Sequence, residues 1–165
     1  MDKKKSPKVQ AAIDYATEMH KGQKRKGGKD YITHPIGTAE ILMSLGYPEN
    51  YIIAALFHDL LEDTDATESK IAELGGEDVL ETVKLLTKKK GVPTREYLAA
   101  IRKNPMAHAV KSADRLHNVR SLKEADDAFR KKYLEETEKY YVDFAIKEID
   151  LVKALDEIKR LPPAK

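Results

Sequence analysis

The sequence predicts an all-α fold, on three observations. Apolar residues recur at three- and four-residue steps along most of the chain, no stretch shows the alternation of a β-strand, and prolines and glycines stand where helices would begin and end. The 165 residues are enough to bury a core without disulfides, and no segment has the composition of a linker. We therefore expect a single domain over 1–165, with a core at about 7–122 and C-terminal helices at about 126–160.

Helix-breaking residues bound the first predicted helices. Apolar spacing indicates a helix over about 7–20, and three glycines then indicate a loop over 22–33. A proline in the first turn and a glycine after the last turn bound a second helix at about 35–45. Pro48 opens a third helix, which is apolar on almost all sides and continues beyond residue 58, so we expect it to cross the centre of the fold.

The same signals continue in the rest of the chain. A threonine in the capping position and a Gly-Gly pair bound a short helix, and further apolar periodicity follows it. The last part of the chain combines helical spacing with dense charge and is expected to form two helices. The predicted helices after the third cover about 67–74, 77–88, 94–103, 106–122 and two segments within 126–160.

Composition excludes several classes of protein. With 35% charged and 41% hydrophobic residues, the chain has the balance of a globular protein, and no apolar run approaches the roughly 18 residues that span a bilayer. The basic N-terminal segment has no apolar stretch behind it, so we do not predict a secretory signal, and we expect a cytoplasmic protein. The absence of cysteine excludes disulfides and cysteine-ligated zinc, so a metal site must use His, Asp, Glu or main-chain oxygen.

The charges nearly cancel overall but are distributed unevenly. Against 28 acidic residues there are 30 basic ones, a net charge of +2 that does not indicate a nucleic-acid binder. Residues 21–30 hold five basic side chains and one acid, whereas 58–65 hold four acids and a histidine. These segments could serve an anionic substrate and a cation; the alternative is two solvated surface patches.

The most informative residues are His58 and Asp59, which lie within the most apolar predicted helix. Ionisable groups buried in a helix are costly unless they are paired or bind a metal ion. Helical spacing places Glu62 and Asp63 one turn further on the same face. The alternative is a helix C-terminus with solvated acids, but acids there oppose the helix dipole.

Two further residues could complete a metal site. His34 precedes a proline at the start of a predicted helix, and Asp114 lies on a helix with an apolar face. Two histidines and two aspartates form a set suited to Mn, Fe or Zn. Taken separately, His34 could be a histidine near a helix cap and Asp114 an ion-pair partner of Arg115. The coincidence of all four favours one site.

Four segments in this order carry a resemblance to a known family: HKGQKRKGGKDYITHP, AALFHDLLEDT, LTKKK and KSADRLHNVRSL. They resemble the hydrolase domain of the RelA/SpoT alarmone enzymes and their stand-alone small hydrolases. The resemblance runs from about His20 to Ser121 and more faintly through 131–141. It implies an HD-type helical bundle that removes the 3′-pyrophosphate from guanosine penta- or tetraphosphate (ppGpp) with one Mn²⁺, although Zn²⁺, Fe²⁺ or Ni²⁺ could be the ion found bound.

The resemblance assigns roles residue by residue. The implied metal ligands are His34, His58, Asp59 and Asp114. Glu62 and Asp63 match the acidic pair that positions or deprotonates the attacking water. The implied substrate contacts are Arg25, Lys26, Asn118 and Ser121. At two positions the chain departs from the family, which usually has threonine at 121 and often Asp, Ser or Thr at 27, where this chain has serine and glycine; the glycine puts guanine specificity in question.

Two other functions remain open at this point. A phosphohydrolase acting on another nucleotide, such as nicotinamide dinucleotide phosphate (NADPH), would use the same metal site. A non-catalytic nucleotide sensor or interaction module would be expected to lack part of the metal quartet or the acidic pair. We predict a small nucleotide as partner, with no nucleic acid or membrane, and leave oligomeric state open. We expect His20 and His117 to be structural, and Arg115 to pair with a carboxylate of the scaffold.

Overall fold

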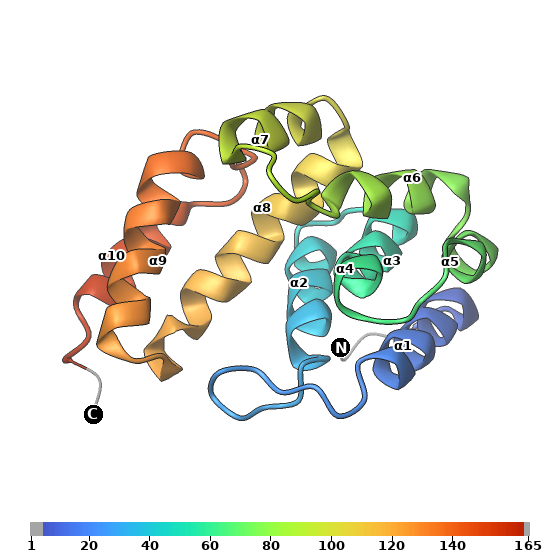
Figure 1. Cartoon of the computed structure of the whole chain (residues 1–165), viewed down its shortest axis with the longest axis horizontal. Helices are drawn as coiled ribbons and strands as arrows, with labels where there is room; N and C mark the ends of the chain where they lie inside the picture. The colour runs from blue at the N-terminus through green and yellow to red at the C-terminus, as the bar shows by residue number, and fades with distance from the viewer. Residues whose placement is uncertain (1–4, 164–165) are drawn as a thin grey trace.

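The computed structural model describes residues 5–163, and this part of the chain consists of helices joined by loops (Figure 1). The only extended pairing within residues 5–163 is an isolated antiparallel bridge between Lys24 and Asp30, so the predicted all-α class is confirmed. The elements in order are α1 (Pro7–Met19), α2 (Thr33–Ser44), α3 (Glu49–Phe57), α4 (Leu60–Asp63), α5 (Glu68–Gly75), α6 (Glu77–Leu86), α7 (Thr94–Arg102), α8 (Pro105–Arg120), the 3₁₀ helix η1 (Ser121–Glu124), α9 (Asp127–Tyr140) and α10 (Leu151–Lys159).

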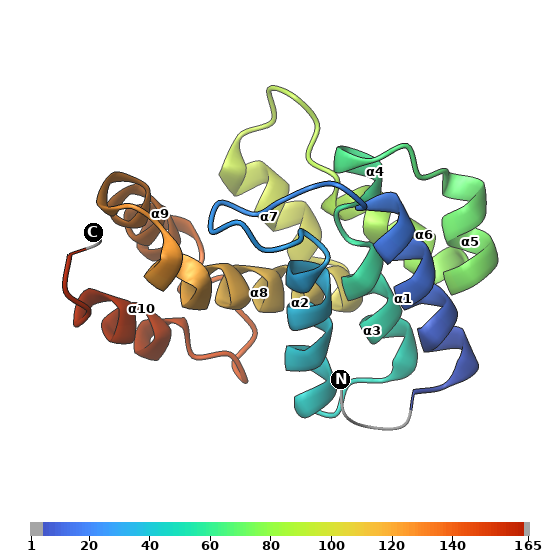
Figure 2. The same ribbon diagram turned by 90° about the horizontal axis from the view of Figure 1, so that it is seen from below.

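Helix α8 connects the two sides of the molecule. Figure 1 shows it running between α1–α6 on one side and α9 and α10 on the other, and Figure 2 shows the same division from below. It packs against α2, α3, α6, α7 and α10. Helix α3 lies at the centre, where residues 52–57 are all buried. The predicted central position of this helix is therefore correct.

Local sequence explains where most helices begin. The Ser6 hydroxyl accepts a hydrogen bond from the Val9 N–H at the start of α1, and Asn104 accepts one from Ala107 N–H at the start of α8. In both helices a proline follows at the first position, where its missing N–H costs nothing. After α2, Gly46 takes a φ of +83°, which a residue with a side chain rarely adopts.

The prediction of one continuous helix through His58 and Asp59 is wrong. Helix α3 ends at Phe57, and the one-turn helix α4 begins only at Leu60. Nδ1 of His58 donates to the Ala55 carbonyl over 2.6 Å. A continuous α-helix would pair that carbonyl with the N–H four residues later. The side chain thus competes with the helical bond, and the chain turns a corner at the dipeptide.

The C-terminal region forms two helices as predicted, α9 and α10, separated by turns over 141–150. Helix α10 packs on α8, which joins this region to the core. Within residues 5–163, no helix is both long and apolar enough to cross a membrane.

Candidate metal centre and adjoining pocket

Three separate segments bring His34, His58, Asp59 and Asp114 together. His34 stands in the first turn of α2, the His58-Asp59 pair forms the corner between α3 and α4, and Asp114 lies on α8. Nε2 of His34 is 2.7 Å from Oδ1 of Asp114, and Nε2 of His58 is 3.3 Å from the same oxygen. Oδ2 of Asp59 is 3.1 Å from His58 Nε2 and 4.0 Å from His34 Nε2. The sequence predicted this grouping.

The cluster has the chemistry of a divalent-cation site. Nδ1 of His58 is engaged with the Ala55 carbonyl, which turns Nε2 toward the carboxylates. That Nε2 is fully buried, and neither of its short contacts to the carboxylates has the geometry of a hydrogen bond. The nitrogen atoms of His34 and His58 and a carboxylate oxygen of Asp59 lie within 4.8 Å of one another. A buried nitrogen without a hydrogen bond among converging oxygens fits a bound cation.

Each of these four side chains also has a partner on its outer side. The Tyr31 hydroxyl donates to Oδ2 of Asp59 over 2.6 Å, and the Lys111 ammonium lies 3.1 Å from Oδ2 of Asp114. Nδ1 of His34 is 2.8 Å from Nδ1 of His117. Sequence reasoning missed Tyr31 and Lys111. A signal existed for Lys111, which stands three positions before Asp114 and hence on the same face of α8.

Electrostatics inside the cluster place a proton on His58. Burial disfavours its charged form, but Asp59 and Asp114 outweigh burial and hold the pKa of His58 well above its usual range. Burial lowers the pKa of His34. Despite burial, His58 lowers the pKa of Asp59 to about 2, and Lys111 and His58 hold the pKa of Asp114 well below its usual range. Two carboxylates therefore face one imidazolium, whose proton a cation could replace.

Glu62 and Asp63 lie beside this cluster on α4. Their carboxylate oxygens and one of Asp59 fall within 4.8 Å of one another. Partial burial and the negative charge of Asp59 raise the pKa of both Glu62 and Asp63. The backbone N–H of Lys88 donates to Glu62 Oε1 over 3.1 Å. These exposed carboxylates, one of them held by the backbone, can accept a proton from water at the cluster.

Asp114 does not pair with Arg115, which was the alternative considered from sequence. Arg115 points away from the cluster toward α9, where its Nη2 donates to Glu136 over 2.9 Å. Its guanidinium carbon lies 3.6 Å from the ring centroid of Tyr141. The prediction that Arg115 pairs with a scaffold carboxylate is correct. Likewise His20 is buried and bonds Gln23, as expected of a structural histidine.

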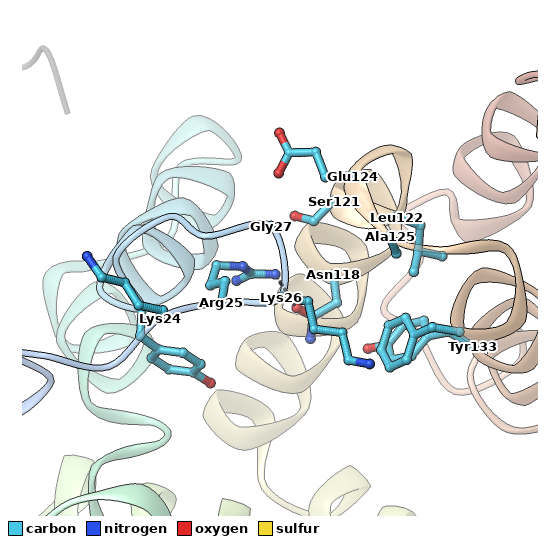
Figure 3. A pocket seen from close by; sticks show the side chains of 12 residues that line it. Lys24, Arg25, Lys26, Gly27, Asn118, Ser121, Leu122, Glu124, Ala125 and Tyr133 are labelled. Atoms are coloured by element: carbon cyan, nitrogen blue, oxygen red, sulfur yellow. Dashed lines mark hydrogen bonds between the residues drawn. The ribbon is translucent and has the colours of Figure 1, made fainter. Parts of the chain in front are cut away.

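A pocket of about 290 Å³ lies between the loop over 22–32 and the η1–α9 region. It brings together the four residues predicted to contact substrate, as Figure 3 shows. Two aromatic rings that sequence reasoning did not assign to a site also line it: Phe129 and Tyr133 stack with centroids 5.6 Å apart. The full lining is Lys24, Arg25, Lys26, Gly27, Tyr31, Asn118, Ser121, Leu122, Glu124, Ala125, Phe129 and Tyr133.

A chain of hydrogen bonds connects the pocket to the cluster. Nη2 of Arg25 donates to Oδ1 of Asn118 over 3.0 Å (Figure 3), and Nδ2 of Asn118 is 3.4 Å from Oδ1 of Asp114. Nη1 of Arg25 is buried and has no hydrogen-bond partner. The Lys26 ammonium sits 3.9 Å above the centroid of the Phe129 ring. The pocket therefore offers cationic donors and an aromatic surface next to the candidate metal centre.

Residues 12–148 match the HD domain family. The chain belongs to this family. A named relative of this HD domain is the guanosine-3′,5′-bis(diphosphate) 3′-pyrophosphohydrolase of Aquifex aeolicus, 39% identical over 145 residues, which cover 83% of this chain and 21% of the relative. A probable GTP pyrophosphokinase of Mycobacterium leprae is 36% identical over 124 residues, covering 70% and 16% of the two chains. This HD domain thus spans about a fifth of the length of the curated relatives it matches.

A solved structure matches the HD domain over nearly its whole length. It is described as a metazoan ortholog of SpoT that hydrolyzes ppGpp, with 29% sequence identity and a TM-score of 0.77. The alignment covers 96% of this chain and 97% of that one. These relatives confirm the resemblance to RelA/SpoT hydrolase domains that the four sequence segments indicated.

Proposed function

We propose that this HD domain is a metal-dependent phosphohydrolase that removes the 3′-pyrophosphate from guanosine 3′,5′-bis(diphosphate). The proposal rests mainly on the two hydrogen bonds that connect Arg25 through Asn118 to Asp114. They join a cationic pocket to the cluster of two histidines and two aspartates. The names of the relatives supply the substrate: one is a 3′-pyrophosphohydrolase and another is described as hydrolysing ppGpp.

His34, His58, Asp59 and Asp114 would hold one divalent cation. A mixed nitrogen and oxygen set accepts Mn²⁺, Fe²⁺, Zn²⁺ or Ni²⁺, and we propose Mn²⁺ as the working ion. When bound, such an ion lowers the pKa of a coordinated water from 15.7 to about 7 and polarises a phosphoryl oxygen. The outer contacts of Tyr31 and Lys111 would keep the two carboxylates oriented toward it.

The acidic pair would handle the proton of the attacking water. Water adds to the phosphorus attached to the 3′ oxygen, the bond from that phosphorus to the 3′ oxygen breaks, and Glu62 or Asp63 takes the proton that water loses. The backbone N–H of Lys88 holds Glu62 in place. A proton then returns to the 3′ oxygen, so that the products are pyrophosphate and a nucleotide with a free 3′ hydroxyl.

The pocket would bind the nucleotide. The free Nη1 of Arg25 offers a charged donor to a phosphate or a base, and Lys26 adds a second positive charge. Asn118 and Ser121 would contact the nucleotide from α8 and η1. The stacked rings of Phe129 and Tyr133 give the pocket an apolar wall against which a base can lie.

We further propose that the described part of the chain, residues 5–163 of the expected domain over 1–165, forms one domain, and that it acts in the cytoplasm. The first part is supported by the packing of α10 on α8, which ties the C-terminal helices to the core. The second is supported by the absence of cysteine and by the nucleotide named for the relatives.

The test is release of pyrophosphate or phosphate from a panel of nucleotides, with ppGpp and NADPH among them, measured with Mn²⁺ and, separately, with a chelator. We expect pyrophosphate from ppGpp only when Mn²⁺ is present. Metal-dependent release of phosphate from another nucleotide alone would keep the metal centre and reject the substrate. A metal-loaded protein that hydrolyses nothing in the panel would favour a nucleotide sensor.

A further inference from the structure

His117 contacts a proposed metal ligand from the side away from the cluster. Its Nδ1 lies 2.8 Å from Nδ1 of His34, and the two ring centroids are 4.9 Å apart. The other nitrogen of His34, Nε2, faces Asp114 at 2.7 Å. His34 is therefore held at both ends, by two residues of α8 that stand three positions apart.

The contact between two ring nitrogens fixes which atoms carry protons. One Nδ1 must donate and the other must accept, because two lone pairs or two N–H groups facing each other at this distance would repel. A histidine that binds a metal ion through Nε2 must carry its proton on Nδ1. His117 Nδ1 must then be the acceptor. Without an ion, the reverse arrangement lets Nε2 of His34 donate to Asp114 while His117 donates to His34.

The packing beneath His117 leaves the ring little freedom to move toward α2. Gly37 lies under it, and a Cβ at that position would stand 2.2 Å from His117 Nε2 and 2.4 Å from its Cδ2. Helix α2 therefore carries a glycine in its interior, although glycine costs about 1 kcal/mol relative to alanine there. The approach of the ring to His34 requires this glycine.

We propose that His117 is a positioning residue: its Nδ1 accepts a hydrogen bond from the Nδ1–H of His34 and so turns the Nε2 lone pair of His34 toward the metal ion. The inference rests on the metal centre of the proposed function but not on its substrate. It assigns a role to a histidine that sequence reasoning treated as structural, and it makes Gly37 the residue that permits this role.

The test measures metal affinity in the full chain without nucleotide. Mn²⁺ is titrated calorimetrically into the metal-free wild type, H117F and H117N. Phenylalanine keeps a ring but offers no acceptor, whereas the amide oxygen of asparagine can take the place of Nδ1. We expect H117F to bind Mn²⁺ about 10- to 100-fold more weakly, as is usual when the outer partner of a metal-binding histidine is lost. We expect H117N to bind nearly as tightly as the wild type.

Two results would overturn the inference: H117F with wild-type affinity, or H117N as weak as H117F. Absence of metal binding by the wild type itself would overturn the proposed function as well, so the two failures can be told apart. If H117F does not fold, the imidazole ¹⁵N spectrum of the Zn²⁺-loaded wild type decides the same point. An Nδ1 of His117 that carries no proton and accepts a hydrogen bond from His34 supports the inference, and a protonated Nδ1 of His117 contradicts it.

Gly37 provides a second, independent variant. G37A should weaken Mn²⁺ binding because the new methyl group displaces the His117 ring. In an H117A background, where no ring remains to be displaced, the same change should cost no further affinity. Equal losses from G37A in both backgrounds would show that Gly37 acts without His117, contrary to the inference.

Discussion

The metal centre and the pocket beside it are built in opposite ways. Asp114, His34 and His58 are 6% exposed or less, lie within or at the end of a helix, and have partners on their outer sides. The pocket is formed by a loop, a 3₁₀ turn and the start of α9, and its basic residue Lys26 is exposed. One region fixes a few atoms closely, whereas the other presents longer side chains on a surface.

The difference separates the two tasks of the proposed enzyme. A site that activates water requires ligand atoms at fixed positions, which rigid helices supply. Recognition of a flexible, highly charged nucleotide can rely on side chains that adjust on binding. We therefore expect changes in the helical cluster to abolish the chemistry, and changes in the pocket to alter affinity for substrate.

The largest effect should follow from removing a ligand at the α3–α4 corner. In D59A, His58 loses a carboxylate at 3.1 Å and Tyr31 loses its acceptor. Metal affinity should fall by more than the roughly 100-fold typical of losing an outer partner, and turnover should disappear with it. Calorimetric titration and pyrophosphate release would measure the two. Wild-type affinity in a folded D59A would remove Asp59 from the ligand set.

Glu62 should separate metal binding from catalysis. E62A removes a proposed proton acceptor that is not a ligand, so turnover should fall by about 10²- to 10⁴-fold while Mn²⁺ affinity stays near that of the wild type. D65A is a matched control, because Asp65 is an exposed carboxylate outside the cluster. Full activity in E62A would leave Asp63 as the base, and loss of metal would place Glu62 among the ligands.

Substitution of Arg25 should test the pocket separately from the metal centre. R25A removes a charge-assisted donor worth about 1.5–3 kcal/mol, which corresponds to a rise in KM of about 10- to 100-fold. Metal affinity should change little, since Arg25 touches Asp114 only through Asn118. K21A, an exposed lysine beyond the pocket lining, is the control. A collapse of metal binding in R25A would mean that the two regions are not separable.

The smallest effect should be a dependence of stability on pH in the metal-free protein. The folded pKa of His58 is raised above its ordinary 6.5, so its contribution is complete below pH 6.5 and is lost as pH rises through the folded value. Asp59, with a pKa lowered to about 2 from 3.8, contributes above pH 3.8 and loses its contribution on acidification toward pH 2. Stability from this pair should therefore peak between these limits.

Thermal unfolding with a chelator and with Mn²⁺ would measure this dependence. Each pKa unit is worth about 1.4 kcal/mol, which corresponds to about 3–6 °C in Tm for a chain of this size. We expect the Tm of the metal-free protein to fall as pH rises above 6.5, and Mn²⁺ to remove that fall by taking the place of the His58 proton. A metal-free Tm that stays level through pH 9 would contradict the charged state assigned to His58.

Most of the fold could be predicted from local signals, and the main error of the prediction lies at the corner between α3 and α4. Caps such as Ser6 and Asn104 act within one turn and can be read from sequence. The break after Phe57 could not, because apolar residues continue through Leu60 on the far side. The corner is held by the hydrogen bond from His58 to the Ala55 carbonyl and by contacts of His58 and Asp59 to residues of α8 and α2 that are distant in sequence.

The site can likewise be divided into residues that the sequence predicted and residues that it did not. A resemblance in motif order identified the inward-facing residues, and the structure brings them together. The outer partners carry no motif of their own: Tyr31 is one of eight tyrosines, and Lys111 one of many basic residues. The alternative that paired Asp114 with Arg115 failed because adjacent residues of a helix project about 100° apart, which directs Arg115 toward α9.

The residues of the cluster are far apart in the sequence, so they are synthesised at different times. His34 and Asp114 are 80 positions apart, and Asp114 lies on the helix that contacts both sides of the molecule. A ribosome delivers α2 and α3 well before α8, so a nascent chain carries the two histidines before their shared carboxylate exists. The four side chains can come together only after α8 has been synthesised and has packed against α2 and α3. Binding of an ion by all four would therefore require that this part of the core has assembled.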